Sequence, residues 1–280
     1  MEQWEKVLFK RQTYPDNYTD KTFLRDLKKN IDFKEITYRD AFLGANLLVQ
    51  EICTVVGFVL IYIYLYNEWL PPNFIFNTFN CLTLAGFLLH KFHYMNNALF
   101  ETISHDLRTL LIYIVFGHLF SPVLYTLTDT ISTDTIYTMT SFMLLIHLLF
   151  FDYGVNATIV SNSLSLSAAI FASICLASRL SSAHQAFIFI TVAIEFFVLS
   201  PHLRVNGKFS LLITFILVLC NLYFLNLISV FVTFIFLVTV SFINIICPLL
   251  FVKYQKYKEN IYGPWDEAIV EDADSSLNLW

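Results

Sequence analysis

The chain has 280 residues, of which 57% are hydrophobic and 14% are charged, and 29 of them are phenylalanine. A composition this apolar excludes a soluble globular domain of the same size. The formal net charge is −5, which differs from the strongly basic balance typical of a nucleic-acid-binding protein. The sequence therefore predicts a polytopic membrane protein without a nucleic-acid partner.

The apolar segments predict about eight transmembrane helices, because one crossing takes about 20 mostly apolar residues. The first six candidates, in chain order, are residues 47–66, 74–90, 107–127, 136–151, 157–178 and 185–200. A charge-free run at 209–252 is too long for one crossing and fits two, with a turn between 221 and 229. The predicted fold is therefore an all-α transmembrane bundle. It divides into an N-terminal segment, the bundle and a C-terminal tail, at residues 1–46, 47–252 and 253–280.

The Lys and Arg residues fall almost entirely on one side of this predicted bundle. With eight spans and a cytosolic N-terminus, sixteen of the 17 basic residues lie on the cytosolic side, and only Arg179 lies on the opposite side. Cytosolic loops of membrane proteins carry such an excess of positive charge. A seven-span arrangement would export Lys253, Lys256 and Lys258, so the charges favour eight spans with both termini in the cytosol.

The segment before the first span has nine basic and eight acidic residues and no apolar stretch, so no signal peptide is predicted there. Within residues 20–31, Asp20 or Thr22 is a possible helix cap, and an apolar face lies beside basic residues. The apolar face is formed by Leu24, Leu27 and Ile31, and the basic residues are Arg25, Lys28 and Lys29. This pattern suits a short helix in the lipid headgroup layer. A solvated lead-in to the first span is the other interpretation.

The fifth span carries a stripe of small residues at every fourth position. Its members are Ala157, Ser161, Ser165, Ala169, Ser173 and Ala177. Small side chains allow helix backbones to approach closely, and such packing holds helices together in lipid. We therefore predict that this face packs against another helix, and the alternative is a serine-rich face that lines a wet cavity.

Four ionisable residues fall within or near the predicted hydrocarbon layer: Glu51, His118, His147 and Glu195. An isolated charge at that depth is costly, so each needs a partner, water or a neutral protonation state. Proton transfer or ligand binding is one interpretation, and hydrogen bonding between helices is the other. No ladder of acidic and basic residues links them across the bilayer, which favours the structural interpretation.

The predicted cytosolic ends of the third and fourth spans carry His105, Asp106, Arg108 and Asp152. An arginine suits a phosphate, and carboxylates suit hydroxyl groups, so these residue types fit a phosphoinositol headgroup. They equally fit helix caps and an interfacial arginine pair. The motifs GxSxG and HExxH and a glycine-rich phosphate loop are absent, and the five cysteines show no CxxC spacing. We therefore predict no catalytic residue, metal site or cofactor in this chain.

Several short segments resemble the PIG-C family, the C-type subunits of phosphatidylinositol N-acetylglucosaminyltransferase. They run through the whole chain and are Trp4 with Lys6-Val7-Leu8, Tyr14-Pro15-Asp16-Asn17-Tyr18-Thr19-Asp20, Ser121-Pro122-Val123-Leu124, Ser132-Thr133-Asp134-Thr135-Ile136-Tyr137, Phe150-Phe151-Asp152-Tyr153-Gly154 and Gly263-Pro264-Trp265-Asp266-Glu267-Ala268. Between residues 209 and 252 the resemblance is only one of hydrophobic character.

The resemblance implies a multi-pass subunit of an endoplasmic reticulum complex that transfers N-acetylglucosamine from UDP-N-acetylglucosamine to phosphatidylinositol, the first step of glycosylphosphatidylinositol-anchor synthesis. Catalysis would belong to a PIG-A type partner, with PIG-H, PIG-P, PIG-Q and PIG-Y type subunits as further partners. The expected docking residues for these partners are Tyr14, Asp16, Tyr18, Pro264, Trp265, Asp266 and Glu267. A lipid or small-molecule transporter or scramblase is the alternative function.

Overall fold

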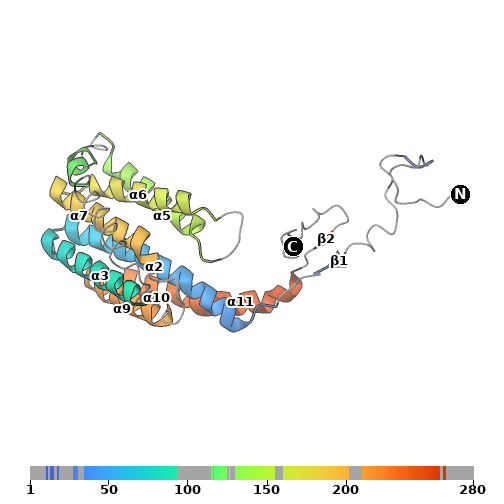
Figure 1. Cartoon of the computed structure of the whole chain (residues 1–280). Helices are drawn as coiled ribbons and strands as arrows, with labels where there is room; N and C mark the ends of the chain where they lie inside the picture. The colour runs from blue at the N-terminus through green and yellow to red at the C-terminus, as the bar shows by residue number, and fades with distance from the viewer. Residues whose placement is uncertain are drawn as a thin grey trace, which may run out of the picture. The chain divides into compact units, whose positions relative to one another are not determined.

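The computed structural model describes residues 11, 13–15, 18, 28–30, 35–93, 115, 117–124, 126, 130–154, 160–201, 210–258 and 261–262. Across these ranges the chain is almost entirely helical (Figure 1). It separates into two compact units, Arg39–Leu249 and a smaller one made of Met1–Tyr38 and Leu250–Trp280. The predicted all-helical class is confirmed.

The described part of the chain consists mainly of helices. In chain order they are α2 (Tyr38–Tyr66), α3 (Pro72–His93), α5 (Thr133–Phe150), α6 (Asn162–Ala177), α7 (Ala183–Ile194), α9 (Ser210–Ile228), α10 (Val230–Ser241) and α11 (Cys247–Tyr254). Two π-helical turns, η1 (Glu195–Leu199) and η3 (Phe242–Ile246), continue α7 and join α10 to α11, and a short 3₁₀ turn, η4 (Gln255–Tyr257), follows α11.

Four of these helical stretches are long and apolar enough to cross a membrane, within the part of the chain that is described. They are Tyr38–Tyr66, Thr133–Phe150, Ser210–Ile228 and Val230–Tyr257, and two shorter apolar helices lie at Asn162–Ala177 and Ala183–Leu199. These findings confirm a membrane protein, while the count of eight spans stays a prediction. The predicted turn within 209–252 is confirmed, because Ser229 interrupts the helix between α9 and α10 in an extended conformation.

Helix α2 contributes side chains to both hydrophobic cores of the larger unit. On one face Phe58 is fully buried and stacks on Phe189 of α7, with ring centroids 4.4 Å apart. On the other face Cys53 and Tyr64 belong to a second core, which α9 and α10 complete. Helix α2 therefore joins the two cores, and half of its most apolar window is buried.

A glycine on α2 lies close to two neighbouring elements. A Cβ atom at Gly57 would lie 3.4 Å from Oδ1 of Asn221 on α9 and 3.4 Å from Cε1 of Phe196 on η1. The amide of Asn221 donates to the carbonyl oxygens of Cys53, at 3.1 Å, and of Leu217, at 2.9 Å. The missing side chain at Gly57 therefore makes room for a hydrogen bond between helices.

The turn between α2 and α3 is a Schellman motif. The N–H of Trp69 donates to the carbonyl of Tyr64, and that of Glu68 donates to Leu65, while Glu68 has a left-handed φ of 55°. The rings of Tyr64 and Trp69 pack edge to face at 5.3 Å, which supplies the apolar contact usual in this motif. Pro72 then occupies the first turn of α3, where a missing N–H costs nothing.

Helices α5 and α6 form the closest packed pair, and the small-residue stripe lies on the buried side of α6. Ser165, Ala169, Ser173 and Ala177 are at most 2% exposed. Ser161 is the N-cap of α6, and Ala157 lies outside the described residues. At the four buried positions the structure agrees with the predicted packing face and not with a serine-rich face that lines a wet cavity.

The smaller unit joins the N-terminal segment to the C-terminal tail. Strand β1 (Lys28–Lys29) pairs antiparallel with β2 (Ile261–Tyr262). Nearby, the side-chain amide of Gln255 accepts a hydrogen bond from the N–H of Ile36 and donates one to its carbonyl, both at 3.1 Å. The interfacial helix predicted for residues 20–31 is wrong at Lys28 and Lys29, because their backbone groups pair with a distant strand.

Candidate functional site

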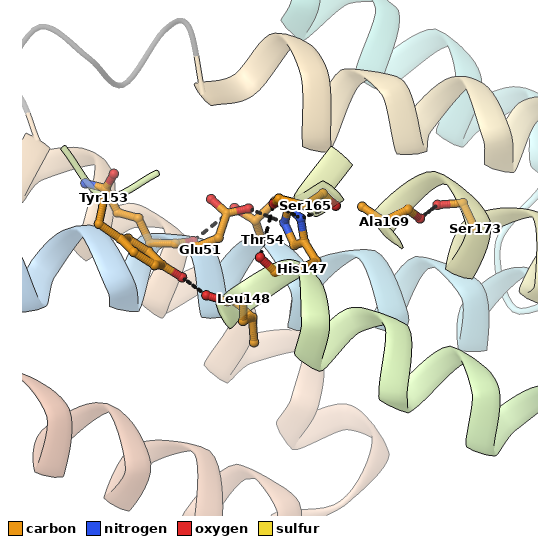
Figure 2. A network of polar contacts seen from close by, with 9 residues as sticks. Glu51, Thr54, His147, Leu148, Tyr153, Ser165, Ala169 and Ser173 are labelled. Carbon is orange, nitrogen blue, oxygen red and sulfur yellow. Dashed lines mark hydrogen bonds and ion pairs between the residues drawn. The ribbon is translucent and has the colours of Figure 1, made fainter. Parts of the chain in front are cut away.

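Three polar side chains from three helices meet inside the larger unit (Figure 2). Glu51 on α2, His147 on α5 and Ser165 on α6 are 0%, 1% and 2% exposed. The Nε2 atom of His147 lies 3.0 Å from Oε1 of Glu51. Its Nδ1 atom lies 2.8 Å from the Ser165 hydroxyl and 3.0 Å from the Ser165 carbonyl oxygen. We call these three side chains the polar cluster.

Local structure brings the cluster together. His147 lies one turn before the end of α5, and α5 begins at the N-cap Ser132, whose hydroxyl accepts from the N–H of Thr135. Ser165 lies in the first turn of α6, where its N–H donates to the carbonyl of the N-cap Ser161. The end of α5 and the start of α6 are therefore adjacent, which sets His147 beside Ser165.

Both ring nitrogens of His147 have polar partners, and which nitrogen donates depends on the tautomer. With a hydrogen on Nδ1, the ring donates to the Ser165 carbonyl, and the Ser165 hydroxyl donates to the carbonyl oxygen of His147, 3.1 Å away. With a hydrogen on Nε2, the ring donates to Glu51, and Nδ1 accepts from the Ser165 hydroxyl. Either tautomer joins the three side chains.

The polar cluster has the residue types of a serine–histidine–acid triad without the geometry of one. In a triad the imidazole nitrogen beside the serine accepts the hydroxyl proton. Here the same nitrogen also faces the Ser165 carbonyl oxygen, and the hydroxyl also has the His147 carbonyl oxygen as an acceptor. The Ser165 side chain is buried, so its hydroxyl is closed to a substrate in this structure, and the arrangement joins three helices by hydrogen bonds.

The imidazole of His147 also packs between aromatic rings. The ring of Phe197, on η1, lies edge-on at 4.9 Å, and that of Phe151, the residue after α5, lies edge-on at 5.6 Å. Phe151 in turn contacts Tyr153 at 5.1 Å. The Tyr153 hydroxyl donates to the carbonyl of Leu148 at 2.8 Å (Figure 2). Contacts therefore run from the polar cluster into the loop that follows α5.

A second set of buried polar groups joins α2 to α9. The amide nitrogen of Gln50 lies 2.9 Å from the carbonyl oxygen of Ser210 and 2.7 Å from the Thr214 hydroxyl, and Asn46 donates to the Ser210 hydroxyl at 3.0 Å. Oε1 of Gln50 is buried and has no hydrogen-bond partner in the described part of the chain. Both sets use α2 residues between 46 and 51, so they lie within two turns of each other on this helix.

The other two ionisable residues singled out from the sequence have different surroundings. Glu195 begins the π-helical turn η1, is 9% exposed and is hydrogen-bonded to Thr83 of α3. Its Oε2 atom has no hydrogen-bond partner within the described ranges. His118 is exposed and sets its ring edge-on to Phe187 at 5.4 Å. Neither residue joins the polar cluster.

Of the predicted headgroup residues, only Asp152 lies in the described part of the chain. It is exposed directly after α5, and its Oδ1 atom accepts a hydrogen bond from the N–H of Gly154 at 2.8 Å. His105, Asp106 and Arg108 lie outside the described residues. The predicted set of four is therefore untested as a set.

The predicted docking residues are likewise described only in part. Tyr14 and Tyr18 are described, and their rings pack with centroids 4.5 Å apart. Asp16, Pro264, Trp265, Asp266 and Glu267 lie outside the described residues. In the described part of the chain, no three His, Cys, Asp or Glu side chains come close enough to hold a metal ion.

Sequence reasoning identified Glu51 and His147 separately and missed that they bind each other. It also treated Ser165 as one member of a packing stripe. The available signal was depth, because Glu51 and His147 each lie about one turn inside the same predicted side of the membrane, and Ser165 lies about two turns inside it. Depth alone leaves open which helices are neighbours, so the partner of each group did not follow from it.

Comparison with known proteins gives one consistent result. A family model described as phosphatidylinositol N-acetylglucosaminyltransferase matches residues 4–266. The C-type subunit of this enzyme from Bos taurus is 42% identical, over 98% of this chain and 96% of the bovine protein, and that from Homo sapiens is 41% identical over the same shares. A Schizosaccharomyces pombe protein named as the GPI2 subunit of this enzyme is 31% identical, over 95% of this chain and 86% of the yeast protein. No solved structure matches. The chain therefore belongs to the PIG-C family of phosphatidylinositol N-acetylglucosaminyltransferase subunits, the family that its sequence resembles.

Proposed function

We propose that this chain is a non-catalytic membrane subunit of the complex that transfers N-acetylglucosamine from UDP-N-acetylglucosamine to phosphatidylinositol, the first step of glycosylphosphatidylinositol-anchor synthesis. The observation that carries the proposal is the match to relatives named as the C-type subunit of this transferase, over nearly the full length of both chains. The buried polar cluster supports a structural rather than a catalytic part, because its hydrogen bonds join helices.

In this proposal the complex lies in the endoplasmic reticulum membrane, and a partner of the PIG-A type performs the transfer on the cytosolic side. Further partners are of the PIG-H, PIG-P, PIG-Q and PIG-Y types. The docking surfaces include Tyr14, Tyr18 and the segment around Trp265. The pairing of β1 with β2 supports this choice, since it joins the two terminal segments that carry these residues in one unit.

We propose eight spans with both termini in the cytosol. Antiparallel pairing of Lys28–Lys29 with Ile261–Tyr262 supports an even number of crossings, because two strands pair only on the same side of a membrane. The distribution of Lys and Arg supports the cytosolic side. The first and last described spans, Tyr38–Tyr66 and Val230–Tyr257, lie directly inside these paired segments in the sequence.

We propose that the bundle presents phosphatidylinositol to the catalytic partner, with His105, Asp106, Arg108 and Asp152 around the headgroup. The exposed position of Asp152 at the end of α5 supports its part in this site, because a carboxylate there is able to accept from inositol hydroxyls. Fixing the lipid in a reactive orientation lowers the barrier to transfer without chemistry by this chain.

The test is to tag this chain, extract it in mild detergent and identify the proteins that purify with it. The eluate is then assayed for modification of phosphatidylinositol that depends on UDP-N-acetylglucosamine. We expect a glycosyltransferase partner and transfer activity. A chain that purifies alone and inactive would instead support the transporter or scramblase alternative, for which the buried Glu51–His147 pair is the favouring observation.

Replacing Arg108 with alanine is expected to reduce transfer at limiting phosphatidylinositol by roughly tenfold or more, since a hydrogen bond to a charged group is worth about 1.5–3 kcal/mol. Arg108→Lys should retain part of the activity, because it keeps the charge and loses the two-pronged geometry. Lys253→Ala is the control, as it removes an exposed positive charge on the same predicted side. Full activity of an assembled Arg108→Ala complex would rule out the headgroup role of this residue.

A further inference from the structure

The loop after α5 contacts the side chain of His147. Phe151 lies one helical turn after His147 and packs against the edge of its ring, and Tyr153 packs against Phe151. The Tyr153 hydroxyl is tied back to Leu148 on α5. The two aromatic residues that flank Asp152 are therefore both held by contacts that end on α5.

Asp152 is hydrogen-bonded to the backbone of its own loop. Its carboxylate accepts from the N–H of Gly154, and Gly154 has a left-handed φ of 79°. On the other side of the loop, the N–H of Ser161 donates to the carbonyl of Phe150 at 3.1 Å, which ties the start of α6 to the end of α5. The backbone on both sides of Asp152 is thus held by Phe151, which packs against His147, and by Tyr153, which packs against Phe151.

The polar cluster fixes the orientation of the His147 ring, against which Phe151 packs. Both nitrogens of His147 are engaged, Nε2 by Glu51 and Nδ1 by Ser165, so rotation of the imidazole would break hydrogen bonds in a buried site. An unsatisfied buried polar group is costly, so the ring is held in one orientation. The ring of Phe197, on η1, also packs against the imidazole.

We propose that Glu51 is a positioning residue for lipid recognition: through His147 and Phe151 it fixes Asp152 in the place where that carboxylate meets the inositol hydroxyls. This inference rests on the function proposed above, and it adds two residues, Glu51 and Phe151, that the sequence did not associate with the headgroup. Glu51 is fully buried and acts on the lipid only through its neighbours.

The experiment uses the purified complex and measures KM for phosphatidylinositol and kcat separately, together with assembly of the complex. Glu51→Leu removes the hydrogen bond to His147 at similar volume, and it is expected to raise KM roughly tenfold, with kcat little changed. Glu51→Gln is the rescuing variant. Its amide N–H is able to donate to a neutral Nε2 and hold the ring, so KM should stay within about twofold. Leu149→Ala is the matched control, since Leu149 is on the same turn as His147 and is 69% exposed.

A second variant keeps the proposal testable if Glu51→Leu fails to assemble. Phe151→Leu leaves the polar cluster intact and removes the ring that lies between His147 and Tyr153, and it should raise KM in the same way. An unchanged KM in assembled Glu51→Leu or in Phe151→Leu would overturn the proposal. Equal KM increases in Glu51→Gln and Glu51→Leu would also overturn it, because charge rather than position would then be the cause. If the wild-type complex transfers nothing to phosphatidylinositol, it is the proposed function that fails.

Discussion

Replacing His147 with alanine is expected to destabilise the chain by about 3–5 kcal/mol, the cost typical of removing one partner from a buried ion pair. The variant leaves the buried Glu51 without its imidazole partner, and it removes the contacts of the ring with the hydroxyl and the carbonyl of Ser165. It also opens a cavity between Phe197 and Phe151, which adds to the loss. The measurement is the fraction of protein that remains monodisperse in detergent after heating in steps.

The matched control for this prediction is His184→Ala. His184 is exposed and makes one described hydrogen bond, at 3.1 Å to Asn73, so its loss should cost no more than about 1 kcal/mol. If His147→Ala and His184→Ala lose monodispersity at the same temperature, the polar cluster does not hold the helices together.

Replacing Gly57 with leucine is expected to push α2 away from α9 and η1. The Cβ atom alone would lie 3.4 Å from both Asn221 and Phe196, so the remaining atoms of leucine would enter space that these side chains occupy. Displacing Asn221 also removes its hydrogen bond to Cys53. Overpacking of this kind costs about 1–3 kcal/mol, and the lost hydrogen bond about 1 kcal/mol more.

Two variants make this second prediction specific. Gly57→Ala adds only the Cβ atom, at ordinary contact distance, so its stability should stay close to that of the wild type. Gly44→Leu introduces the same side chain on the same helix, where nothing lies within 4 Å of the added Cβ atom. In the heating assay only Gly57→Leu should be unstable. A stable Gly57→Leu protein would mean that the two helices separate without cost at this position.

The features that sequence reasoning predicted correctly are those that depend on neighbouring residues. Ser229 separates α9 from α10 within the predicted turn, and the four-residue spacing from Ser165 to Ala177 defines a buried face. The first follows from the length of the charge-free run, and the second follows from helix periodicity.

The features that it missed depend on residues far apart in the sequence. Glu51 and His147 are 96 positions apart, and no local pattern states which helix lies beside α2 at that depth. Lys28 and Lys29 are compatible with a helix by their spacing, yet their backbone groups pair with Ile261 and Tyr262. A pairing of two residues from each strand is too short to leave a pattern in either segment.

The pairing of β1 with β2 also bears on the order of synthesis. Asn30 donates to the carbonyl of Lys258, which lies 228 residues later in the chain. At a translation rate of about 5–20 residues per second, the first of these residues is made roughly 10–50 seconds before the second. The N-terminal strand therefore stays unpaired while all the intervening helices are inserted, and the smaller unit is completed only when the tail emerges. During that interval the segment that contains Tyr14 and Tyr18 is open to other proteins on its side of the membrane.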